Sequence, residues 1–317
     1  MKRLTILALS FALVAMAATS ASAAMKRINF GTGGTTGIYY TLGGVIAQVL
    51  NEKGVMEITV QSTGASNENL RLVQQGEVPI AFSQNDLAYA AYNGLAPYKE
   101  KYTNITAIAA THSELIHAVA REGAGITKIE DFKGKKISLG ARGSGNEANC
   151  RQIFPFFGLD AAYKDIKPIF LPYGESVDQF KDRQIDAFLF TFPFPHPIMM
   201  DIVTTHNVVY LPIEGKQADD IIAQYPYFFK ADIPAGTYKG QEKAVPTIGV
   251  KAMIIANKDA SEDDIYAITK GLFEHLEDIR KGHSKAQEIS LETALEAMTI
   301  PLHPGAERYY REKGLIK

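Results

Sequence analysis

The chain has 317 residues, of which 46% are hydrophobic and 21% are charged, and its formal net charge is −2. This apolar content is sufficient for a folded core, so the composition excludes an intrinsically disordered protein. The charge balance argues against a polybasic surface for nucleic acid. The length predicts about two domains. The single cysteine, Cys150, cannot form an internal disulfide, which excludes a small disulfide-stapled scaffold.

The first 24 residues have the pattern of a secretory signal peptide. Two basic residues precede an almost wholly apolar run over 4–18, and small residues follow at 21–23. The apolar run is shorter than the ~20 residues that a membrane-spanning helix needs, so a membrane anchor is the weaker interpretation. We therefore expect cleavage after residue 23 or 24 and export of the remaining chain, most simply to a bacterial periplasm.

Short apolar runs alternate with segments of helical periodicity in the first part of the remaining chain. The pattern predicts strands over 26–31, 57–61 and 78–83, and helices over 38–50, 66–75 and 86–92. Strands that alternate with helices in this order are typical of a mostly parallel sheet with helices on both faces.

A second unit of the same kind follows. The pattern predicts strands over 105–111, 115–121, 135–139, 168–171, 185–191 and 208–211, with helices over 144–157 and 176–183. It then predicts a long β-rich run over 245–256 and helices over 261–281 and 284–298, while the proline-rich stretch 225–246 is expected to be irregular. We therefore expect an α/β protein with two lobes that face a cleft.

Two glycine-rich turns, Gly31–Gly37 and Gly143–Asn146, stand where a strand is expected to give way to a helix. Ligands of open α/β sheets bind at such strand ends, where helix N-termini present free backbone N–H groups and a partial positive charge. The first turn has Thr36 where a dinucleotide motif requires glycine, and it lacks the G-K-[ST] of a P-loop. We expect turns that bind a small acid, and the alternative is a glycine turn without a ligand.

Side chains near these turns are the candidate ligand-binding residues. They are Thr35, Thr36, Gly37 and Tyr39 in the first turn and its helix, Ser83 and Gln84 after the third strand, and Arg142, Ser144, Gly145 and Asn146 in the second turn. Arg142 could hold a carboxylate through two parallel hydrogen bonds, or it could be an ordinary solvated arginine. Ser144 could instead cap its helix together with Glu147, and Asp86 is expected to cap the helix that follows Gln84.

The sequence carries no motif that indicates catalysis or a bound metal. None of the seven histidines has metal-ligand spacing, and H-E-x-x-H, a cysteine pair and G-x-S-x-G are all missing. We expect no metal, no cofactor and no enzymatic activity, with an exported enzyme as a minor alternative because catalytic triads assemble from distant residues. Cys150 is expected to be buried, the alternative being a reactive thiol.

Several segments, taken in their order and spacing, resemble one known family along the whole mature chain. They are GTGGTTGIYY (31–40), ASNENL (65–70), IAFSQND (80–86), LG (139–140), GSG (143–145), IPAGTY (233–238), IPLHPGA (300–306) and YY (309–310). The family is the TAXI family of TRAP-transporter solute-binding proteins.

The resemblance implies a two-lobed fold of the periplasmic-binding-protein type II, which closes over a small solute and delivers it to a membrane permease driven by an ion gradient. The implied solute is acidic: glutamate, a related amino acid, or a C4–C5 dicarboxylate such as 2-oxoglutarate. The implied pocket is lined by Thr35, Tyr39, the Asn69 region, Ser83, Gln84 and 144–146. We expect one lobe from residues 25–119 and 248–317, a second from 120–247, and a monomer.

One wall departs from the family, which commonly has a small Gly-x-Pro segment after the strand that ends near residue 190. This chain reads FTFPFPHP over 190–197. The added aromatic residues and prolines would stiffen and narrow that wall, so Phe192 is a further candidate contact. The acid is therefore left open, and an aromatic acid or another organic acid is an alternative. The same fold could also serve a sensor kinase rather than a permease.

Overall fold

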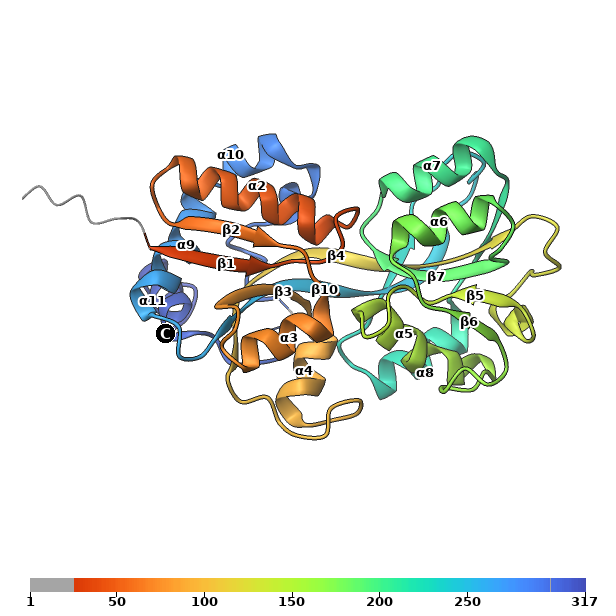
Figure 1. The fold of residues 1–317 in the computed structure, drawn as a ribbon, viewed down its shortest axis with the longest axis horizontal. Coiled ribbons are helices and arrows are strands. Elements are labelled where there is room, and N and C mark those ends of the chain that lie inside the picture. The colour runs from red at the N-terminus through yellow and green to blue at the C-terminus, as the bar shows by residue number, and fades with distance from the viewer. Residues whose placement is uncertain (1–25, 297) are drawn as a thin grey trace, which may run out of the picture.

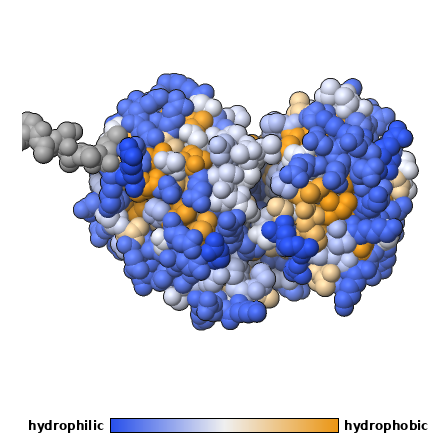
Figure 2. Space-filling view, viewed as in Figure 1, coloured by the Kyte–Doolittle hydropathy of each residue, from blue (hydrophilic) through white to orange (hydrophobic). Residues whose placement is uncertain are grey.

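The computed structural model describes residues 26–296 and 298–317, and the predicted signal peptide over 1–24 lies outside these residues. The described chain forms two lobes, and its surface is hollowed between them (Figures 1 and 2). Within this part of the chain, no helix is long and apolar enough to cross a membrane.

Lobe I, at the left of Figure 1, combines parallel strands with helices from both ends of the chain. Its elements are β1 (Arg27–Gly31), β2 (Glu57–Gln61), β3 (Ile80–Gln84), α2 (Ile38–Glu52), α3 (Ser66–Gln74), α4 (Asn85–Asn93), α9 (Glu262–Glu274), α10 (Leu276–Gly282), the 3₁₀ turn η3 (Ser284–Glu288) and α11 (Pro304–Glu312).

Lobe II is built from the middle of the chain. Its elements are η1 (Ile129–Phe132), β5 (Lys136–Ser138), α5 (Gly145–Ile153), η2 (Phe154–Phe157), β6 (Lys167–Ile169), α6 (Tyr173–Lys181), β7 (Ala187–Phe192), α7 (Pro197–Thr205), β8 (Val208–Leu211), α8 (Gly215–Gln224) and β9 (Phe229–Ile233). Two long strands, β4 (Ile105–Arg121) and β10 (Val245–Asn257), run through both lobes and join them (Figure 1).

The described strands form one mixed sheet in the order β2-β1-β3-β10-β4-β7-β5-β6, with β8 paired to β4 and β9 to β10. The β1–β2 and β1–β3 pairs in lobe I and the β5–β6 and β5–β7 pairs in lobe II are parallel. The two long strands run antiparallel to each other and to their other neighbours. The predicted two-lobed α/β fold is confirmed, and the antiparallel pairs lie where the long strands join the lobes.

Helices cover both faces of the sheet in each lobe because apolar residues recur on one side of each helix. In α2, for example, Leu42, Ile46 and Leu50 are all buried against the sheet, as the helical period of the sequence predicts. The lobe limits predicted at 119/120 and 247/248 stay a proposal. Core packing favours a first limit nearer residue 114, because Leu115 and Ile116 already pack in the cores of lobe II.

Some predicted elements are wrong in their limits or type. The two strands expected over 105–121 are a single strand, because β4 accommodates an extra residue at each of two register shifts against β10 and the pairing continues. The helix expected over 284–298 is only the short turn η3, whose Lys285 and Glu288 side chains bond to Phe194 O and Ser113 N. The sequence pattern also missed α7, α8, α11 and β9.

Candidate functional site

A cavity of about 160 Å³ lies between the lobes, at the carboxyl ends of β1, β2 and β3 in lobe I and of β5, β6 and β7 in lobe II. Both lobes contribute to its wall, so a molecule inside it contacts both. A cavity of about 150 Å³ in another protein holds a benzene molecule, so this cavity suits a small solute.

Six helices begin at this cavity. The residue at the N-terminal cap of each helix lines it: Gly37 (α2), Ala65 (α3), Gln84 (α4), Ser144 (α5), Pro172 (α6) and His196 (α7). Backbone N–H groups in a first helical turn have no partner within the helix, and the helix dipole adds a partial positive charge there. The wall is therefore suited to an anionic group such as a carboxylate.

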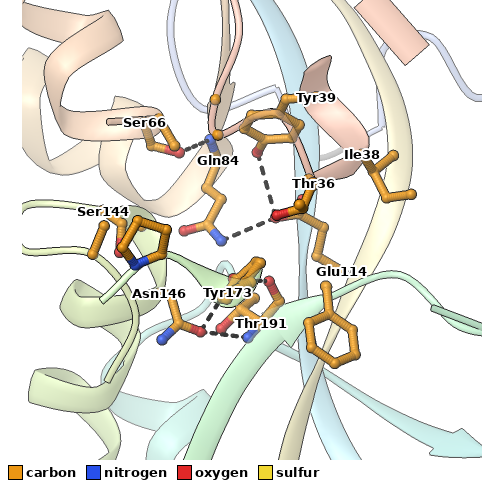
Figure 3. A pocket seen from close by; sticks show the side chains of 18 of the residues that line it. Thr36, Ile38, Tyr39, Ser66, Gln84, Glu114, Ser144, Asn146, Tyr173 and Thr191 are labelled. Carbon is orange, nitrogen blue, oxygen red and sulfur yellow. Dashed lines mark hydrogen bonds between the residues drawn. The ribbon is translucent and has the colours of Figure 1, made fainter. Parts of the chain in front are cut away.

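A buried carboxylate, that of Glu114 on β4, also lines the cavity (Figure 3). Its Oε2 accepts a hydrogen bond of 2.9 Å from Gln84 Nε2 and a longer one of 3.4 Å from the Tyr39 hydroxyl. Its Oε1 lies 3.6 Å from His112 Nε2. The described lining residues include no lysine or arginine, so Glu114 has no strong cation beside it in the cavity.

The wall from lobe II is held by one asparagine. Asn146 Nδ2 donates to the carbonyl oxygens of Leu139 (2.6 Å) and Leu189 (3.0 Å), and its Oδ1 accepts from the backbone N–H of Thr191 (2.5 Å). The Tyr173 hydroxyl donates to Thr191 O at 2.7 Å (Figure 3). These bonds fix Thr191 and Tyr173 on the cavity wall and occupy the amide of Asn146.

His196 is a hydrogen-bond donor on the same wall. Its Nδ1 accepts from the backbone N–H of Ile198 at 3.3 Å, so in the neutral imidazole the proton is on Nε2. Burial lowers the pKa of His196 to about 3, which keeps the ring neutral at neutral pH. Nε2 is buried and has no hydrogen-bond partner within the described residues. The ring stacks on Phe192 at 4.3 Å between centroids.

Eight of the sequence-predicted residues line the cavity. They are Thr36, Gly37, Tyr39, Gln84, Ser144, Gly145, Asn146 and Phe192. Ser144 also accepts a hydrogen bond from Glu147 N, as the capping interpretation predicts. Their contacts with a solute stay a prediction, and for Asn146 the bonds described above leave a supporting role.

Four predicted residues lie outside the cavity lining. Thr35 is exposed to solvent, and Asn69 is buried with its Nδ2 on Thr32 O and Phe82 O. Ser83 faces away because neighbouring side chains of a strand point to opposite faces, so it cannot share the cleft with Gln84. Arg142 is exposed, and its guanidinium lies over the Phe170 ring, 3.8 Å from the centroid.

Replacing Arg142 with alanine is expected to change solute affinity by less than about threefold, because a guanidinium stacked outside the cavity makes no charge-assisted bond to the solute. Isothermal titration of wild type and Arg142→Ala with the same acid measures this. If Arg142→Ala lowers the affinity more than tenfold, the arginine must leave Phe170 and enter the site when a solute binds.

Sequence reasoning missed Glu114, Tyr173, Thr191 and His196. Glu114 is the single acidic residue in the strand over 105–121, and that isolation was the available signal. Thr191 and His196 belong to the 190–197 segment, which attracts attention for its aromatic residues and prolines rather than for its donors. Tyr173 carried no signal, because nothing local marks the start of α6 as facing β7.

The part of the chain that the structure describes contains no group of three histidine, cysteine or carboxylate side chains placed to hold a metal ion. Cys150 is buried, and burial raises the pKa of its thiol well above its usual range.

A family model described as the NMT1-like family matches residues 30–314. Among solved structures, the chain is similar to a protein from Bordetella bronchiseptica RB50 at 16% identity, covering 91% of this chain and 98% of that one with a TM-score of 0.59. It is similar to MatC from Rhodopseudomonas palustris with bound malate at 11% identity (91% and 97% covered, TM-score 0.58). It is also similar to a binding protein component of an ABC phosphonate transporter from Pseudomonas aeruginosa at 12% identity (86% and 83%, TM-score 0.55).

At these identities the solved structures show a shared two-lobed fold, that of periplasmic solute-binding proteins. The family model covers nearly all of the described chain. The chain therefore belongs to the NMT1-like family, which is of the periplasmic binding protein type.

Proposed function

We propose that this protein captures a small carboxylate-bearing solute between its lobes and delivers it to an ion-gradient-driven membrane permease of the TRAP type, as a TAXI-like receptor. The convergence of six helix N-termini on one cavity, without a lysine or arginine in its described lining, carries this proposal. Such a wall holds a carboxylate through backbone N–H groups and hydroxyls.

The Glu114 carboxylate favours one kind of acid over another. A dicarboxylate such as 2-oxoglutarate would bring a negative charge into a cavity that already holds a buried carboxylate, whereas an α-amino acid also brings an ammonium group that can bond to Glu114. Among the acids that the sequence suggests, we therefore propose an acidic amino acid such as glutamate before 2-oxoglutarate.

We further propose that the receptor acts in the periplasm, as a monomer and without catalysis. The signal-peptide pattern over 1–24 supports the location. The cavity chemistry supports reversible binding: its hydroxyl, amide and imidazole groups are held by hydrogen bonds to one another or to the backbone.

Isothermal titration of the mature protein with L-glutamate, L-glutamine, 2-oxoglutarate, succinate and fumarate tests the proposal. We expect L-glutamate to bind most tightly, with a dissociation constant in the micromolar range or below. Native mass spectrometry of freshly purified protein checks for a solute retained from the cell, which would otherwise mask binding. Failure of every acid to bind at millimolar concentration, to protein free of retained solute, would refute a carboxylate receptor.

A further inference from the structure

The lobes make a polar contact beside the cavity. Asp86, in the first turn of α4 of lobe I, accepts a hydrogen bond of 2.8 Å from Asn149 Nδ2 on α5 of lobe II. Both side chains are completely buried (0% exposed). Helices α4 and α5 lie on the same side of the sheet, one from each lobe (Figure 1). The contact therefore exists only while the lobes are together, since moving them apart gives both side chains to water.

This contact is connected to the wall of the cavity. Asn149 Oδ1 accepts a hydrogen bond of 2.9 Å from the Thr191 hydroxyl, and Thr191 lines the cavity. Because its oxygen is engaged by Thr191, the Asn149 amide presents its Nδ2 donor to Asp86. The chain Thr191–Asn149–Asp86 thus links the solute site to the junction of the lobes.

The surroundings of Asp86 disfavour a negative charge. Asp86 Oδ1 is buried without a partner within the described residues. The titratable groups that face the carboxyl are Glu114 on β4, Tyr39 on α2, Tyr98 after α4 and Tyr227 before β9, all of them acids. Burial raises the pKa of Asp86 to about 7, although the backbone N–H of Leu87 and the Asn149 amide oppose the change.

We propose that Asp86 couples closure of the lobes on a solute to the uptake of a proton. With the lobes apart, water solvates the carboxylate and it is ionised. On closure a proton from the solvent binds Oδ1, Oδ2 keeps the Asn149 hydrogen bond, and the neutral acid is buried. The proposal rests on the closure of the lobes over a solute proposed above, and the same coupling applies to the solute-free protein as its lobes open and close.

Proton uptake sets the sign of the pH dependence. Because the carboxyl has a higher pKa in the closed state than in the open state, protonation favours closure. This stabilisation of the closed state grows as the pH falls below about 7, and it is lost as the pH rises through 7. We therefore expect solute affinity to rise by about thirtyfold from pH 8 to pH 5.5.

Titration calorimetry with L-glutamate at pH 6, in two buffers of different ionisation enthalpy, measures the protons taken up per solute bound. We expect uptake of up to one proton in wild type and none in Asp86→Asn, whose amide oxygen can still accept from Asn149. The matched control is Asp263→Asn. Asp263 is an exposed carboxylate on α9 that pairs with Arg308, and its replacement should leave proton uptake as in wild type. Equal proton uptake in wild type and Asp86→Asn would overturn the proposal.

A second measurement does not depend on the identity of the solute. Small-angle scattering without added solute should show that wild type becomes more compact from pH 8 to pH 5.5. The Asp86→Asn variant should be equally compact at both pH values. Asn149→Asp places two carboxylates face to face and should make the pH dependence of compaction steeper. A compactness that is independent of pH in wild type and in Asn149→Asp would refute the coupling, while failure of L-glutamate alone to bind would refute only the proposed solute.

Discussion

Replacing Gly145 with alanine is expected to weaken solute binding by roughly tenfold to hundredfold without unfolding either lobe. Gly145 is the first residue of α5 in lobe II, and a Cβ there would lie 2.1 Å from Gln84 Oε1 and 3.0 Å from Ser66 Oγ in lobe I. Both distances are too short for the lobes to stay in their present positions. Overpacking of this kind costs roughly 1–3 kcal/mol, and here the cost falls on the closed state.

Gln84 cannot relieve this clash by a simple rotation. Its side chain is buried, and its Nε2 is held at 2.9 Å by Glu114, so moving Oε1 breaks that bond. The open state, by contrast, tolerates the substitution, because Gly145 has no positive φ and alanine is the better helix former. The effect should therefore appear in affinity and not in the melting temperature of the solute-free protein.

Two measurements separate an effect on affinity from an effect on stability. They are isothermal titration with the solute that wild type binds, and thermal unfolding without solute. The matched control is Gly44→Ala in α2, where an added Cβ meets no atom within 4 Å and the affinity should not change. Wild-type affinity in Gly145→Ala would mean that the lobes do not come this close around a bound solute.

The polar turns of the site could be predicted from sequence because their signals are local. A glycine-rich turn between an apolar run and a helical pattern marks a strand end, and the structure places both such turns at the cavity. Ser144 followed by Glu147 is likewise a short-range capping pattern, and the Ser144 cap is present.

The remaining parts of the site depend on contacts between distant segments. Glu114 faces the cavity only because β4 crosses from one lobe to the other, and Asp86 meets Asn149 across 63 positions of the chain. Arg142 was the obvious charge beside a turn, yet the nearby Phe170 ring holds its guanidinium outside the lining. Local patterns predict which residues are polar at strand ends, whereas packing between the lobes decides which of them reach the solute.

Replacing Glu114 with glutamine is expected to lower the affinity for L-glutamate by roughly tenfold to hundredfold, because a charge-assisted hydrogen bond to the ammonium group contributes roughly 1.5–3 kcal/mol. The affinity for 2-oxoglutarate, which has no ammonium group, should stay the same or rise, since the variant removes a repelling charge. The amide oxygen can still accept from Gln84 Nε2 and the Tyr39 hydroxyl, so the cavity should keep its shape.

The ratio of the two affinities in Glu114→Gln, measured by isothermal titration, distinguishes charge recognition from structural support. Glu122→Gln is the matched control: Glu122 is an exposed carboxylate just beyond the end of β4, it accepts from Asn207 Nδ2, and its loss should leave both affinities unchanged. An equal loss of affinity for both acids in Glu114→Gln would mean that Glu114 only holds Gln84 and Tyr39 in place. A shift of the ratio toward 2-oxoglutarate would instead identify Glu114 as the residue that makes this cavity select an amino acid, since every other described charge near the solute comes from helix ends that any carboxylate can use.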